Sequence, residues 1–197
     1  SDSVRGAAAE AAARCGASGS AATALLTQGN DYHAGSSSVL FDSALSDVVW
    51  SMDGNRLAAT DVPAAIYNNE LAKDCFYKAL ALDTNSLDAA AGIARESVDI
   101  SAKLDTLAAA GQDVADLQAA AAEGMLAVES AGLGALDRAL QMSVASGDAA
   151  TGARLAAVIG AIAGQPTAGL NAAMSGGGFS MQGEAAVALA HIAVRSQ

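Results

Sequence analysis

The chain opens with an alanine-packed stretch, DSVRGAAAEAAARCG at residues 2–16, and a similar stretch, LAAVIGAI, returns at residues 155–162. Alanine has the highest intrinsic helix propensity of the common residues. Its small side chain also lets neighbouring helices approach closely. The recurrence of such stretches therefore predicts short helices that stack on one another into an elongated body.

The composition supports an all-α fold. Hydrophobic residues make up 52% of the 197 residues, whereas aromatic residues supply only 4% and proline occurs twice. Most of the twenty glycines fall where helices would end. The length fits one large domain or two small ones. We expect a single α-helical repeat domain over residues 1–197, and, because the chain begins inside a helical unit, a fragment of a longer protein.

The charge is strongly acidic, with a formal net charge of -11 and an isoelectric point near 4.3. Nucleic acids and anionic membrane surfaces attract positive charge, so the sequence argues against both as partners. No apolar run reaches the roughly 18 residues that a membrane-spanning helix needs, so we expect no membrane insertion. The acidity either serves solubility or complements a basic protein partner.

Cys15 and Cys75 are the only cysteines and fit positions for small buried side chains. They neither require a disulfide nor exclude one. The compartment, cytoplasmic or periplasmic, therefore stays open.

Helix boundaries can be placed from capping and breaking residues. Residues 2–15 and 21–28 read as helices, the polar segment 29–38 as a loop, and residues 39–50 as a helix that ends before a break at 53–55. Asp61 and Pro63 favour a helix start, and that helix ends at residues 83–85. Further starts follow at Ser86, Asp113 and Asp148. The last helices cover residues 131–145, a stretch reaching Met174, and 184–194, with short connections that suit antiparallel neighbours.

Residues 2–16 resemble the second helix of a HEAT repeat, whose usual pattern is D-x-x-V-R-x-x-A-x-x-A-L. Residues 148–164 resemble another copy, and residues 170–175 with 184–190 resemble the two helices of a further unit, about 31 residues on. Residues 72–85 resemble the closing helix of a tetratricopeptide repeat, although Thr84 replaces its usual proline.

These resemblances imply a HEAT-like (armadillo-type) fold, a right-handed α-solenoid of stacked antiparallel helix pairs. They also imply a non-catalytic module for protein–protein interaction or scaffolding. The alternative implied by the family is an accessory subunit or substrate-cradling enzyme of the lyase type. Fold alone does not decide between them. Paired carboxylates in one cleft would favour the enzyme.

Signs of catalysis or of metal binding are scarce in the sequence. His33 and His191 are the only histidines, and neither has a second ligand at zinc spacing. We expect His191 in the core or at a groove edge. Residues 83–94 start like a calcium loop but lack its glycine and its final glutamate. No nucleophile motif or phosphate loop occurs, so we expect no metal, no cofactor and no enzymatic activity, with the lyase-type alternative left open.

Two groups of residues remain as candidates for binding. Carboxylates crowd residues 83–129, where Asp99 is spaced to pair with Arg95 and Lys103, and we expect them on a solvated face or an acidic docking stripe. Trp50 is the sole tryptophan, either a buried plug or an interface anchor. Aromatic, methionine and polar residues on or near the expected loops make up our predicted binding set: Tyr32, His33, Trp50, Met52 and Asp53.

Overall fold

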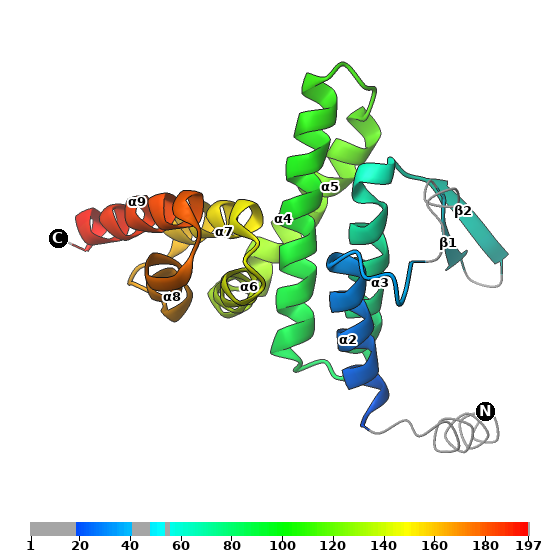
Figure 1. Cartoon of the computed structure of the whole chain (residues 1–197), viewed down its shortest axis with the longest axis horizontal. Coiled ribbons are helices and arrows are strands. Elements are labelled where there is room, and N and C mark those ends of the chain that lie inside the picture. Colours follow the sequence, from blue (N-terminus) through cyan, green and yellow to red (C-terminus); the bar gives the residue numbers. More distant parts are fainter. Residues whose placement is uncertain (1–18, 41–47, 54–55, 197) are drawn as a thin grey trace.

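The computed structural model describes residues 19–40, 48–53 and 56–196, and in this part of the chain it is predominantly helical (Figure 1). Eight helices, α2 to α9, and one two-stranded hairpin make up the described residues. The all-α prediction is therefore confirmed for the helices and wrong for the hairpin. The expected helix at 2–15, with its HEAT-like motif and Cys15, lies outside the described residues.

The first described helix is α2 (Ala21–His33), which begins at Ser20, whose Oγ accepts a hydrogen bond from Thr23 N at 3.1 Å. The sequence predicts a loop from residue 29, but the helix continues through residues 29–33, five residues beyond its predicted end. Composition misled the prediction because these residues are polar. The side chains of Asn30 and His33 find hydrogen-bond partners on α4, and Gly29 is buried.

The hairpin consists of β1 (Val48–Asp53) and β2 (Arg56–Asp61), which pair antiparallel from Val48↔Asp61 to Asp53↔Arg56. A helix was predicted to run to about Trp50, so the prediction is wrong for residues 48–50; its part at 41–47 lies outside the described residues. The break predicted at 53–55 does separate the two strands. Valine and tryptophan favour strands, and a short apolar run does not distinguish helix from strand by periodicity. Gly-Asn between two such runs is itself a hairpin signal.

The next three helices occur where capping residues predict them. α3 (Ala64–Leu82) follows Pro63, and α4 (Leu87–Ala109) begins at Ser86, whose Oγ accepts from Ala89 N at 3.3 Å. α5 (Ala115–Ala131) follows Asp113 and Val114. The stretch that starts like a calcium loop begins with a turn at residues 83–86, and Ser86 then caps α4, as the sequence indicates.

The C-terminal part holds α6 (Leu133–Ser146), α7 (Ala149–Ile162), α8 (Ala168–Gly176) and α9 (Phe179–Arg195). Asp148 caps α7, and its Oδ1 accepts from Thr151 N at 3.2 Å. α9 starts five residues before its predicted beginning at Glu184, directly after the glycine turn. His191 is exposed on α9 and therefore has no place in the core.

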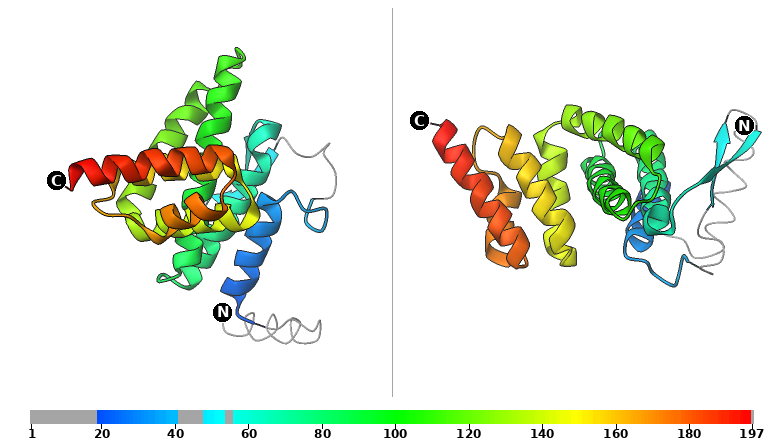
Figure 2. Two further views of the ribbon diagram at one scale, coloured as in Figure 1. Left: turned by 60° about the vertical axis from the view of Figure 1, so that its left-hand side comes forward. Right: turned by 90° about the horizontal axis from the view of Figure 1, so that it is seen from above.

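The helices pack mainly on neighbours that are close in the chain order. α4 lies at the centre, where it contacts α2, α3, α5 and α6, whereas α6, α7, α8 and α9 pack on one another toward the C-terminus. Seen from above, the molecule extends from α9 at one end to the hairpin at the other (Figure 2). The hairpin projects beside α3, its only helical neighbour with several contacts in the described part of the chain.

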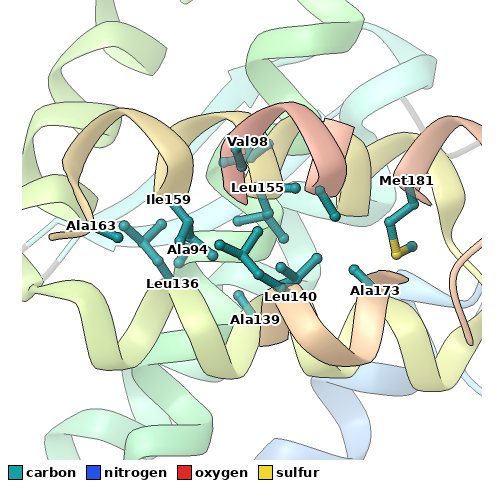
Figure 3. Close-up of a cluster of buried hydrophobic side chains, with 14 of the residues drawn as sticks. Ala94, Val98, Leu136, Ala139, Leu140, Leu155, Ile159, Ala163, Ala173 and Met181 are labelled. Atoms are coloured by element: carbon teal, nitrogen blue, oxygen red, sulfur yellow. The ribbon is translucent and has the colours of Figure 1, made fainter. Parts of the chain in front are cut away.

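The largest core cluster joins α4 to the C-terminal helices (Figure 3). Leu136 and Leu140 from α6 meet Leu155 and Ile159 from α7 in this cluster, and all four side chains are fully buried. Many of the remaining members are alanines. The core is thus thin and closely packed, as the small-residue composition predicts.

A second core region forms around the fully buried ring of Phe76 on α3. A Cβ added at Gly29 of α2 would lie 2.7 Å from a ring carbon, and one added at Gly92 of α4 would lie 2.6 Å from another. Both distances are too short for real carbon contacts. The two glycines therefore let α2 and α4 close on the ring from two sides.

None of the described helices combines the length and the apolar character that crossing a lipid bilayer requires.

Cys75 on α3 is buried, as predicted, and this environment should lower the reactivity of its thiol. Burial, and secondarily the neighbouring Asp74 carboxylate, raise the pKa of the Cys75 thiol above its usual value. In a Cys15→Ser background, we expect the native protein at about pH 8 to react with iodoacetamide on the order of 100-fold more slowly than the unfolded chain. Equal rates would contradict the buried thiol.

The raised pKa of Cys75 also makes the stability of the fold depend on pH. Because the folded-state pKa is raised, the contribution of the protonated Cys75 is fully present below the unfolded pKa and is lost as pH rises through the folded one.

Candidate functional site

The predicted binding residues fall on two separate elements. Tyr32 and His33 end α2, whereas Trp50, Met52 and Asp53 belong to β1, where the backbones of the last two pair with Leu57 and Arg56. The structure places each group beside a different hollow. His33 lines one between α2, α4 and α6, and Trp50 lines another between the hairpin, α3 and α5.

Tyr32 serves mainly in packing. Its ring is partly buried against the cluster around Phe76, and its hydroxyl oxygen accepts a long hydrogen bond from Gln28 Nε2 at 3.4 Å. His33, the other predicted residue on α2, lines the hollow between α2, α4 and α6.

Two adjacent hollows share the residues Lys73, Tyr77 and Ala120. One, of about 390 Å³, lies between the hairpin, α3 and α5, and the other, of about 400 Å³, lies between α3, α4 and α5. We call them together the hairpin groove. Its walls are mostly apolar or aromatic: Val49, Trp50, Val62, Tyr77, Leu117 and Ile100. Trp50 is 61% exposed, so the expectation of a buried plug is wrong.

Charges line the hairpin groove as well. Lys73 Nζ pairs with Glu70 Oε1 at 2.7 Å, and Lys78 outside the lining pairs with Asp74. Glu123 has no ion pair among the residues that the structure describes. The lining thus holds three carboxylates and one lysine.

A second set of charges is buried in the centre of the molecule. Glu96 on α4 is 0% exposed, although the sequence predicts its stretch of carboxylates on a surface. His33 Nδ1 lies 2.9 Å from Oε1 and 3.1 Å from Oε2 of Glu96, and Asn69 Nδ2 donates to Oε2 at 2.8 Å. The carboxylate of Glu96 is therefore in contact with side chains from both α2 and α3.

Arg95, beside Glu96 in sequence, is 3% exposed and is held on several sides. Its Nε donates to Glu96 Oε1 at 3.1 Å, and its Nη2 donates to Asn30 Oδ1 at 3.0 Å. The guanidinium carbon lies 5.9 Å from the centroid of the Phe76 ring, within the range of a cation–π contact. The guanidinium is therefore fixed in position before any ligand arrives.

The network continues to the surface at one end. Asn69 Nδ2 also donates to Asp99 Oδ2 at 2.8 Å, and Lys103 Nζ lies 2.8 Å from both Asp99 Oδ2 and Asn69 Oδ1. The predicted pairing of Asp99 with Lys103 is confirmed. Arg95 pairs with Glu96 rather than with Asp99.

The hollow above these charges, of about 510 Å³, is the charged pocket, formed by α2, α4 and α6. Its polar lining consists of Asn30, Asp31, His33, Asp88, Arg95, Arg138 and Ser146. His33 Nε2 lies 3.6 Å from Asp148 Oδ2, beyond hydrogen-bond distance. Leu26, Met142 and Ala145 supply an apolar wall.

The buried members of this network were missed from the sequence. A signal existed, because Glu96 is spaced three and four residues from Ile93 and Ile100, on the face of α4 that turns out to be buried. A charged residue at such a position indicates a buried partner. Its partners come from α2 and α3, and nothing local in the sequence names them.

No group of three or more histidine, cysteine, aspartate or glutamate side chains in the described ranges is arranged to hold a metal ion. Comparisons of the chain with protein-family models, with curated proteins and with solved structures found no significant match.

Proposed function

We propose that this chain is a non-catalytic protein-binding module, a HEAT-like α-solenoid whose hairpin groove takes a segment of a protein partner. Support for the solenoid comes from the packing order, since helices contact neighbours close in the chain and α6 to α9 add to one end of the stack. Stacked helical units of this kind offer extended surfaces for partners.

The observation that carries the proposal is the exposed tryptophan beside the hairpin groove. Trp50 is 61% exposed and Leu57 is 65% exposed on a hairpin that projects from the helices. Tyr77, also exposed, lines the same groove. Tryptophan and tyrosine are among the side chains most often found as energetic anchors of interfaces.

The partner segment is basic in this proposal. The hairpin groove carries three carboxylates against one lysine, and the chain has a net charge of -11. A basic segment with an apolar or aromatic anchor would complement both the walls and the charge. Added salt would then slow its association.

Cross-linking first identifies the partner, and replacing Trp50 by alanine then tests the hairpin groove. A photo-reactive phenylalanine analogue at position 50 should cross-link one partner in cells that make the protein, and the same analogue at exposed Phe179 of α9 should not. With that partner purified, Trp50→Ala should weaken binding by about 2 kcal/mol, roughly 30-fold, in a titration calorimeter.

The matched control is Phe179→Ala, since Phe179 is 94% exposed on a different helix. Both variants should keep the melting temperature of the parent protein, because neither side chain is buried. Equal cross-linking at the two positions, or unchanged affinity of Trp50→Ala, would refute the groove as the binding surface.

A further inference from the structure

The charged pocket is a second candidate site, remote from the hairpin groove in its lining residues. Its floor is α4, and its walls are α2 and α6, so three helices contribute to one hollow of about 510 Å³. This volume lies in the range typical of small-molecule sites. The proposal made for the hairpin groove does not use it.

The pocket contains donor groups that the protein itself leaves unused. Arg95 engages Nε and Nη2, and no hydrogen bond of Nη1 occurs within the described residues. Arg138 donates through Nε to Asp88 Oδ1 at 2.7 Å, and its two terminal nitrogens have no partner in the same part of the chain. The two guanidinium groups therefore present free N–H donors to one space.

Burial makes the Arg95 donor the important one. Its side chain is 3% exposed, so water solvates the guanidinium poorly, and contacts on several sides hold it still. A carboxylate that reaches Nη1 gains a charge-assisted hydrogen bond at little cost in side-chain ordering. A carboxylate is thus the group that this end of the pocket would recognise.

Acidic residues line the pocket as well. Asp31 contributes a carboxylate with no side-chain hydrogen bond among the residues described, and Asp88 shares Arg138. The lining thus holds two carboxylates and two guanidinium groups. The carboxylates would repel a simple anion, and the guanidinium groups would repel a simple cation. A molecule that carries both charges and is neutral overall matches the lining.

From these observations we infer that the charged pocket binds a small zwitterion with an apolar body, such as an apolar amino acid or dipeptide. Arg95 and Arg138 hold its carboxylate, Asp31 and Asp88 attract its ammonium group, and Leu26, Met142 and Ala145 contact its apolar part.

Ligand-induced shifts in NMR spectra of the full chain would test the inference with defined probes. Leucine and dileucine are the zwitterions. Their N-acetyl derivatives lack the ammonium charge, and their amides lack the carboxylate. At concentrations up to about 10 mM, at least one zwitterion should shift resonances of α2, α4 and α6, and each blocked derivative should bind about tenfold more weakly.

Two variants at the rim avoid disturbing the buried network. Arg138→Gln and Asp31→Asn should each weaken binding of the zwitterion about tenfold. Arg154→Gln, an exposed arginine on α7 outside the pocket, should not change it. Unshifted spectra with both zwitterions, binding of a blocked derivative as tight as that of its parent, or equal effects of Arg138→Gln and Arg154→Gln would each overturn the inference.

Discussion

Replacing Glu96 by glutamine should lower the free energy of unfolding by about 3 kcal/mol, one of the largest single-residue effects in this chain. Three nitrogen atoms lie within hydrogen-bond distance of its fully buried carboxylate, His33 Nδ1 and the donors Asn69 Nδ2 and Arg95 Nε. Glutamine offers one oxygen and turns an NH₂ group toward these donors. It also leaves the positive charge of Arg95 buried without its counter-charge.

Urea titration followed by circular dichroism would measure this loss. Glu184→Gln on α9 is the matched control, because Glu184 is exposed, and its effect should stay within about 0.5 kcal/mol. Combining Glu96→Gln with Arg95→Gln should cost less than the sum of the two single variants, since the second change removes the unpaired charge. A loss below about 1 kcal/mol for Glu96→Gln would contradict a buried ionised carboxylate.

Replacing Gly92 by alanine should lower the free energy of unfolding by about 2 kcal/mol. At an exposed helical glycine the same change usually raises it. Alanine favours a helix over glycine by up to about 1 kcal/mol. Here, however, the added Cβ would lie 2.6 to 2.7 Å from three carbons of the Phe76 ring. The ring has little freedom to move away, because Gly29 of α2 and Arg95 lie against it.

Thermal and urea unfolding would both report the change. Gly183→Ala on α9, where a Cβ meets open space, should instead stabilise the protein by a few tenths to about 1 kcal/mol. Adding Phe76→Leu to Gly92→Ala should cost less than Phe76→Leu costs alone, because the new methyl group fills part of the space of the ring. Stabilisation by Gly92→Ala would show that α4 does not approach Phe76 this closely.

Most of the helices could be predicted from local sequence. Ser86 and Asp148 begin α4 and α7 as capping residues should, and Pro63 precedes α3. These signals work because a helix start is decided by hydrogen bonds within a few residues of chain. The early start of α9 escaped prediction because the residue that precedes it, Gly178, has no side chain to cap the helix.

The hairpin and the end of α2 were predicted wrongly for different reasons. Gly54-Asn55 is a local signal that favours a hairpin, so β1 and β2 were within reach of the sequence. Residues 29–33 were not, because a glycine followed by polar residues reads as a loop until Phe76, Arg95 and Glu96 are placed against them.

The candidate sites divide along the same line. Trp50 was identified from the sequence because a lone tryptophan in a chain poor in aromatic residues is conspicuous by itself. The charged pocket was predicted only in part. His33 was predicted to bind, but Arg95, Glu96 and Asn69 were assigned to no site.

By itself, the sequence determined a helical protein with small-residue packing, the starts of most helices, a strong acidic charge and a single tryptophan as a binding candidate. The tertiary structure alone decided that Arg95 and Glu96 are buried, that Phe76 closes against two glycines, and that α2, α4 and α6 form a pocket. The physical reason is the distance along the chain over which each interaction acts. Capping and helix propensity act over a few residues, whereas His33, Asn69 and Glu96 meet across 27 to 63 residues of chain, and that meeting depends on how whole helices pack.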